Sequence, residues 1–306
     1  MQNATSIRSY LLLLGIGVVW GGQFVFNAQA IESLPPATVA AARAVLGALT
    51  LSLVSYFKPE PRLGAKPAGS LPLGRLLMLI ALFETVLPLF LIAWGQQHVS
   101  SSVTAVLVGS VPIVTLLLST VMSARNHFTV FSGLSVLLGF LAIWVLVDPG
   151  ADGLSEQHTL IYEGAIFLGV ISFGISLNLM EKIPLHAPIR STRNMLWLSS
   201  APLLLVALLF DQPWSLSWGM HNIVPLMLLG VLGSGLAYLM YTALVQQRGS
   251  VFTSLSNFIV PMVGVLLGVL ARGEDFGARQ GWALGLIIAA LAVNEMRGIF
   301  RARQAV

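Results

Sequence analysis

The chain has 306 residues, of which 56% are hydrophobic and only 9% are charged, whereas soluble domains carry about 25% charged residues. So few polar groups could not cover the surface of a soluble protein of this size, and we expect most of the chain to lie in lipid. The net charge of +4 does not indicate nucleic-acid binding, because the basic residues are scattered between apolar segments. The absence of cysteine excludes disulfides, iron–sulfur clusters and thiolate zinc sites.

Ten apolar runs reach about the length that a membrane-spanning helix needs, which is about 20 residues. They cover residues 9–30, 37–57, 73–96, 100–123, 129–148, 160–181, 189–210, 222–246, 250–271 and 278–297. Since only helices and closed barrels satisfy their backbone hydrogen bonds in lipid, and these runs do not alternate, we predict an all-α membrane protein with ten transmembrane helices. The first run resembles a signal peptide, with Ala28-Gln29-Ala30 at its end, but its length favours a retained helix.

The distribution of Lys and Arg predicts the orientation of the chain. With both termini in the cytoplasm, thirteen of the sixteen Lys and Arg residues fall on the inside, two fall outside, and Arg43 lies within a helix. Because cytoplasmic loops carry the excess of basic residues in membrane proteins, this split favours cytoplasmic termini and an even number of helices.

One sequence pattern occurs twice in the chain. Residues 96–112 read QQHVSSSVTAVLVGSVP and residues 246–261 read QQRGSVFTSLSNFIVP, offset by 150 at the Gln pair and by 149 at the Pro. Short matches also arise by chance in apolar sequence, but the preserved helix number and spacing favour a repeat. Each half, residues 1–150 and 151–306, then holds five helices. Because five is odd, the second half would enter the membrane from the opposite side, which is the inverted repeat found in many secondary transporters.

Ten helices in two sets of five, Trp20-Gly21 in the first helix, and Pro112 and Pro261 in the fourth and ninth resemble the drug/metabolite transporter superfamily, in its EamA-like branch. The resemblance covers nearly the whole chain, and within that branch the sequence is most similar to the YddG-type aromatic amino-acid exporters. It implies a bacterial inner-membrane protein that exports amino acids and related metabolites, and sometimes toxic cations such as methyl viologen.

The first helix offers a candidate substrate-binding face. Trp20, Gln23, Phe24 and Asn27 are three or four residues apart, which places them along one side of a helix. This mixture of aromatic and amide groups suits an amphipathic aromatic solute. Gly17 and Gly21, four residues apart in the same helix, are typical of close helix packing instead.

Two charged residues lie within predicted spans, where polar groups are costly and often functional. Glu84, four residues before Pro88, would hold a substrate ammonium group or carry a coupling proton, or it would form a structural hydrogen bond. Arg43 would bind a carboxylate or extend outward to the membrane surface, and its closeness to the helix end favours the second interpretation. A pair between Glu84 and Arg43 would neutralise both.

Prolines within the spans mark candidate hinges or gates, because each removes a helical hydrogen bond. Pro88, Pro112 and Pro261 are these candidates, and the last two occupy matching places in the two halves. Further candidates for substrate binding are Ser110, Ser256 and Asn257, which lie near the prolines, and Tyr238 and Tyr241, which line a cavity or face lipid.

No nucleotide-binding glycine-lysine loop occurs, and all five His residues lie in or beside loops, so the sequence favours neither an ATP-driven pump nor an enzyme, a metal site or a cofactor. The leading hypothesis is a secondary transporter that exports aromatic amino acids and related small amphipathic solutes by alternating access. The alternatives are an exporter of aromatic or quaternary cations and, more remotely, a membrane scaffold or enzyme. The expected partners are the solute and the lipid bilayer, and ten helices suffice for a functional monomer.

Overall fold

The computed structural model describes residues 2–61, 71–99, 104, 107–122, 129–147, 159–183, 187–260, 262–263 and 277–304. These residues form helices joined by turns and loops, with no strand among them. Six helical segments are long and apolar enough to cross a membrane: Ile7–Ile31, Pro36–Phe57, Leu73–Gly95, Leu160–Met180, Pro188–Asp211 and Met220–Arg248. They coincide with six of the ten predicted spans, which are thereby confirmed as helices of spanning length.

The six segments are built from shorter units. In chain order these are α1 (Gln2–Gly21), α2 (Gln23–Ile31), α3 (Pro36–Phe57), α4 (Leu73–Ile80), η1 (Ala81–Val86), α5 (Leu87–Gly95), α9 (Thr159–Met180), α10 (Pro188–Val206), η2 (Ala207–Asp211), α11 (Met220–Met227), η4 (Leu228–Leu236) and α12 (Ala237–Arg248). The segments η1, η2 and η4 are π-helical, and η3 (Pro213–Ser215) is a short 3₁₀ turn.

The other four predicted spans contain shorter apolar helices within the described residues: Leu107–Met122, Val130–Val145, Ser250–Val260 and Gly281–Asn294. The first and third of these stretches include α7 (Val111–Met122) and α13 (Ser250–Ser254). The second and fourth lie within α8 (Val130–Val147) and α15 (Ala278–Gln304). Because the parts of these stretches that the structure describes are shorter than a bilayer requires, the count of ten spanning helices stays a prediction.

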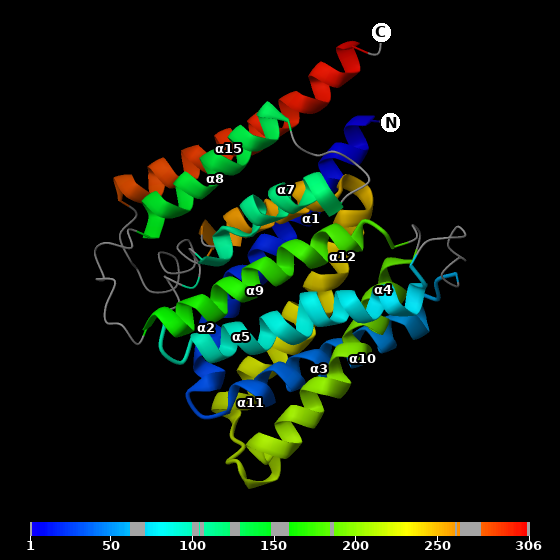
Figure 1. Cartoon of the computed structure of the whole chain (residues 1–306), viewed down its shortest axis with the longest axis vertical. Coiled ribbons are helices and arrows are strands. Elements are labelled where there is room, and N and C mark those ends of the chain that lie inside the picture. The colour runs from blue at the N-terminus through cyan, green and yellow to red at the C-terminus, as the bar shows by residue number, and fades with distance from the viewer. Residues whose placement is uncertain are drawn as a thin grey trace.

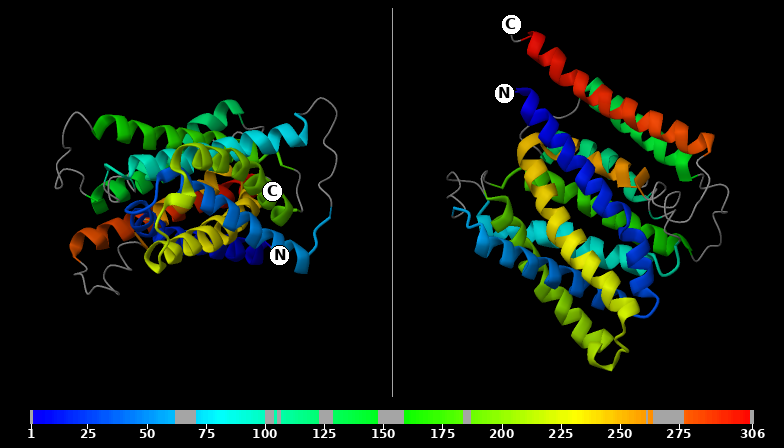
Figure 2. Two further views of the ribbon diagram at one scale, coloured as in Figure 1. Left: turned by 90° about the horizontal axis from the view of Figure 1, so that it is seen from below. Right: turned by 180° about the vertical axis from the view of Figure 1, so that it is seen from behind.

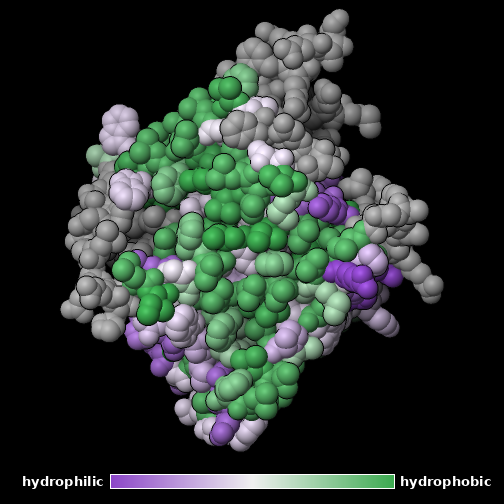
Figure 3. All heavy atoms as spheres, viewed as in Figure 1, coloured by the Kyte–Doolittle hydropathy of each residue, from purple (hydrophilic) through white to green (hydrophobic). Residues whose placement is uncertain are grey.

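Apolar side chains cover much of the outside of the bundle. Figure 3 shows a broad hydrophobic face, with hydrophilic residues gathered near its margins. Large apolar side chains such as Val121, Val130 and Phe210 are more than three-quarters exposed. A patch of this size on a soluble protein would cause association, so lipid is the solvent that fits this surface.

The helices pack mainly as neighbours far apart in sequence. α3 lies along α10, α8 along α15, and α1 against α12 (Figures 1 and 2). In both figures the start of α1 and the end of α15 lie toward the same end of the bundle.

Two glycines allow close helix crossings at matching places. A Cβ at Gly21 would lie 2.6 Å from Cγ1 of Val263, and a Cβ at Gly174 would lie 2.7 Å from Cγ1 of Val114. The two valines are 149 residues apart, as are Pro112 and Pro261 of the repeated sequence pattern. The expected close packing is also confirmed at Gly17, where a Cβ would lie 2.4 Å from the side chain of Ile259.

The π-helical segments η1 and η4 also occur at matching places, since η1 ends at Val86 and η4 ends 150 residues later at Leu236. A π turn disturbs the regular pairing of backbone carbonyls. Across the offset of 150, the carbonyls of Phe83 and Gly233 both accept a side-chain hydrogen bond from another helix. Ser172 Oγ donates to Phe83 at 2.8 Å, and Trp20 Nε1 donates to Gly233 at 2.9 Å.

The paired helices α3 and α10 cap each other's N-termini. The carboxylate of Asp211, at the end of η2, accepts bonds of 2.7 and 2.8 Å from the backbone N–H and the hydroxyl of Thr38. The carboxylate of Glu60, just beyond α3, accepts bonds of 3.1 and 2.8 Å from the backbone N–H groups of Ile189 and Arg190. Acids at helix N-termini satisfy donors that lack partners within the helix, so each helix of this pair stabilises the other.

Candidate functional site

A small enclosed cavity lies inside the bundle, with walls from both sides of residue 150. It is lined by Trp20, Gln23, Asn27, Arg43, Leu89, Ile92, Gln96, Val108, Phe173, Tyr238, Tyr241 and Asn257. Its volume is about 30 Å³, which is room for about two water molecules by the usual requirement of 10–15 Å³ each. Pockets that bind small molecules hold roughly 300 Å³ or more. The cavity has about a tenth of that volume.

An aromatic cluster forms one wall of the cavity. The ring of Trp20 lies 4.9 Å from that of Tyr241 and 5.5 Å from that of Tyr238, centroid to centroid. All three side chains are buried, and the bond from Trp20 Nε1 to the carbonyl of Gly233 fixes the indole against η4. The aromatic rings are thus held in place before any solute arrives.

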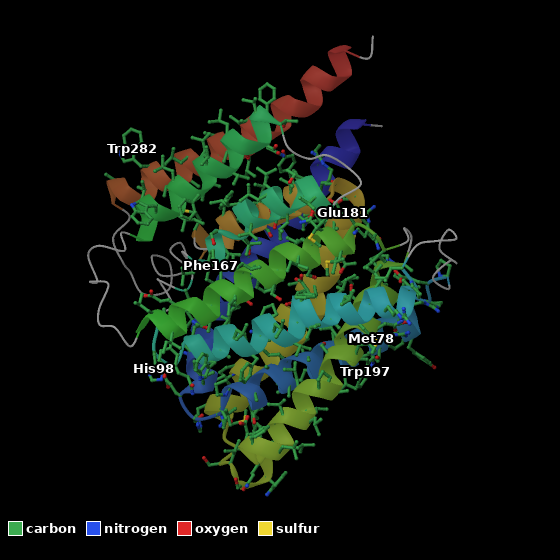
Figure 4. All side chains as sticks on the ribbon, in the orientation of Figure 1. Met78, His98, Phe167, Glu181, Trp197 and Trp282 are labelled. Carbon is green, nitrogen blue, oxygen red and sulfur yellow. The ribbon has the colours of Figure 1, made fainter. Side chains whose placement is uncertain are left out.

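A chain of polar side chains forms another part of the cavity lining. Arg43 Nη2 donates to Gln23 Oε1 at 3.1 Å, and Nη1 donates to Asn27 Oδ1 over a longer 3.5 Å. Asn27 Nδ2 in turn donates to Gln96 Oε1 at 2.7 Å. Gln96 is two residues before His98, which Figure 4 shows at one end of the bundle, with Glu181 at the opposite end. The polar wall therefore extends toward the His98 end.

The prediction that Arg43 extends outward is wrong. Its side chain is only 6% exposed, because Gln23 and Asn27 of α2 hold the guanidinium inside the bundle. Among the described residues, no hydrogen bond or ion pair joins it to Glu84.

Six of the residues predicted to bind substrate line this cavity: Trp20, Gln23, Asn27, Tyr238, Tyr241 and Asn257. The alternative that the two tyrosines face lipid is excluded by their burial, at 2% and 1% exposure. The side chain of Phe24 lies outside the described residues, although its backbone belongs to α2. The sequence did not single out Gln96, Phe173 or Val108 as lining, although Phe173 echoes Trp20 in the second half.

Three other predicted site residues are not among those lining the cavity. The hydroxyls of Ser110 and Ser256 donate to carbonyls three residues earlier, those of Leu107 and Thr253, at 2.6 and 2.8 Å. Glu84 is fully buried in η1, and its backbone carbonyl accepts a 3.1 Å bond from the Tyr238 hydroxyl. The segment that carries Glu84 is thus joined to the cavity wall through Tyr238.

The predicted hinge prolines fall at breaks in helices. Pro88 lies directly after η1, and Pro112 follows a turn at Ser110 where α7 begins. Both are buried, as a proline in a lipid-exposed helix interior would leave its freed carbonyl without a partner. Pro261 lies outside the described residues.

A second hollow, of about 340 Å³, lies between α3, α10 and α11 and opens to the surface. Among the described residues that line it, only Thr38 and Trp218 have hydrogen-bonding side chains, and the Thr38 hydroxyl already donates to Asp211. The hollow therefore offers few groups that could orient a polar solute. The described residues contain no cluster of three or more His, Asp or Glu that could hold a metal ion.

The chain matches a transporter family over almost its whole length. The family model described as the EamA-like transporter family matches residues 7–148 and again residues 160–295. Protein PagO of Salmonella typhimurium is 22% identical over 95% of this chain and 91% of its own length. The uncharacterized transporter YoaV of Bacillus subtilis is 22% identical over 94% of both chains.

The uncharacterized inner membrane transporter YedA of Escherichia coli K12 is 22% identical over 92% of this chain and 88% of its own. One crystal structure superposes with a TM-score of 0.73 at 16% identity, over 93% of this chain and 95% of that chain, which shows a shared fold. With two family matches that together span most of its sequence, the chain belongs to the EamA-like transporter family of multi-pass membrane proteins.

Proposed function

We propose that the protein is a secondary transporter that exports aromatic amino acids and related small amphipathic solutes by alternating access. The observation that carries this proposal is the partly enclosed cavity, whose lining combines aromatic rings with a guanidinium and amide groups. Such walls match a solute that is apolar at one end and polar at the other. The small volume fits one stage of a cycle in which access opens to each side in turn.

The cavity favours this solute class over aromatic or quaternary cations. Arg43 places a positive charge at the cavity wall, while the buried acid Glu84 is not part of that wall. Like charges close together in a medium of low dielectric repel strongly, so a cation would meet a barrier here.

We further propose that residues 1–150 and 151–306 are inverted five-helix repeats within a ten-helix bundle whose termini are cytoplasmic. The two separate family matches support this proposal. Further support comes from the structural equivalents across the offset: the Gly21 and Gly174 crossings, the carbonyls of Phe83 and Gly233, and the reciprocal caps of α3 and α10. Rocking of one half against the other would then open the cavity alternately.

The proposed location is the bacterial inner membrane, where the relative YedA is named as an inner membrane transporter. A functional monomer is the simplest arrangement, because one chain supplies every wall of the cavity.

The test is uptake of labelled L-tryptophan, L-phenylalanine and L-tyrosine into proteoliposomes that contain the purified chain. We expect saturable uptake of each amino acid and competition among the three. Uptake is measured separately with and without a pH gradient. A matched control is Trp282→Ala, which removes an exposed Trp pointing away from the bundle (Figure 4), whereas Trp20→Ala should abolish competition. Absence of flux for all three solutes would reject the aromatic amino-acid proposal.

A further inference from the structure

The guanidinium of Arg43 has fewer partners than it can bind. It carries five N–H donors, yet its acceptors among the described residues are the amide oxygens of Gln23 and Asn27, the second at 3.5 Å. Its Nε is buried without a partner. The side chain is 6% exposed and faces the cavity, so neither bulk water nor the rest of the described protein completes its hydrogen bonds.

The charge of Arg43 is also without a counter-ion. Both acceptors are neutral amides, and among the described residues no hydrogen bond or ion pair joins Arg43 to the carboxyl of Glu84. A buried charge with no partner is costly, and charged groups retained inside a membrane protein usually serve the passage of a solute. The missing partner is therefore an anionic group that enters the cavity.

A carboxylate is the anion that fits this place. It accepts two parallel N–H bonds from one guanidinium, a geometry that an amide oxygen cannot match. The amide oxygens of Gln23 and Asn27 are weaker acceptors than a carboxylate, so an incoming carboxylate can replace them at Arg43. The rings of Trp20 and Tyr241 line the same cavity and can contact an aromatic group on the same solute.

We propose that Arg43 binds the carboxylate of the transported solute, and that this contact, more than any contact with an ammonium group, selects what the site accepts. The inference rests on the proposed function, because it assigns the solute of that same cavity. Among the described residues that line the cavity there is no acid to receive an ammonium group. An aromatic carboxylate without an amino group should therefore bind, and an aromatic amine without a carboxylate should not.

The experiment compares three matched ligands: L-phenylalanine, 3-phenylpropionate, which lacks the amino group, and phenethylamine, which lacks the carboxylate. Dissociation constants are measured by calorimetry on the purified full chain in detergent. We expect the two carboxylates to bind within about tenfold of each other and phenethylamine to bind ~10- to 100-fold more weakly, the range for hydrogen bonds to a charged group.

Variants then assign the effect to one side chain. Arg43→Gln should weaken the two carboxylates ~10- to 100-fold and leave phenethylamine unchanged, while Arg43→Lys, which keeps the charge but loses the planar fork, should fall between. The control Arg193→Gln removes a guanidinium that bonds Ser55 and Asn194 outside the cavity, and it should change none of the three constants.

The possible results separate the two proposals. If phenethylamine binds wild-type protein as well as phenylalanine, or if Arg43→Gln weakens all three ligands alike, the assignment of Arg43 is overturned while the aromatic site survives. If wild-type protein binds none of the three, the proposed function itself fails. Should Arg43→Gln not fold, the ranking of the three ligands on the wild-type protein decides the question alone.

Discussion

Ser172→Ala tests whether a side chain from one helix stabilises the π-helical segment of another. Pro88 has no N–H, so it cannot donate to the carbonyl four residues earlier, at Glu84, or five residues earlier, at Phe83. The Tyr238 hydroxyl and Ser172 Oγ donate to these two carbonyls instead, at 3.1 and 2.8 Å. Removing Oγ leaves the Phe83 carbonyl unsatisfied in a buried place, with almost no change in packing volume.

We expect Ser172→Ala to lower the free energy of unfolding by about 1 kcal/mol, between the average of about 0.6 and the maximum of about 1.7 kcal/mol found for side-chain hydrogen bonds between helices of one membrane protein. In a Pro88→Ala background the same change should cost close to nothing, because the restored N–H gives the strained turn a backbone donor. Unfolding is followed by circular dichroism during titration of mixed micelles with SDS.

The matched control is Ser199→Ala, which removes a fully buried hydroxyl that bonds only carbonyls of its own helix. These carbonyls keep their regular helical donors, so the control should be near neutral. An equal cost of Ser172→Ala with and without Pro88, or a control as costly as the test, would refute the reasoning.

Two further substitutions test the helix contacts. Gly21→Leu should strongly reduce the yield of folded protein in size-exclusion chromatography, because even a Cβ there would lie 2.6 Å from Val263. The control Gly133→Ala should be tolerated, because a Cβ there would meet no atom within 4 Å. Equal yields of the two variants would contradict the packing. Asp211→Ala should destabilise the protein by about 1 kcal/mol, as losses of helix N-caps do, because the two donors of Thr38 lose their acceptor. An unchanged unfolding midpoint would show that this cap does not stabilise the protein.

The hydropathy of the sequence was enough to locate the long helices and one face of the site. Apolar length fixed the six long segments to within two residues at most ends, since lipid imposes that length directly. Helical spacing then placed Trp20, Gln23 and Asn27 on one face, and that face lines the cavity.

The remaining features depend on contacts between segments distant in sequence. Arg43 turns inward because α2 supplies two amide acceptors, and nothing in its own helix indicates this. Ser110 and Ser256 are satisfied by their own helices, a choice of rotamer that composition does not reveal. The π-helical segments leave no hydropathy signal, although Pro88 marks one of them.

The measurement that tests the account most directly is the accessibility of a single cysteine in the cavity wall from each side of the membrane. The chain has no native cysteine, and Val108, which lines the cavity, is close to cysteine in size. The account predicts that a membrane-impermeant maleimide labels Val108→Cys both in right-side-out spheroplasts and in inside-out vesicles, and that L-phenylalanine slows both reactions. Labelling from one side only, or at rates that L-phenylalanine does not change, would contradict alternating access through this cavity.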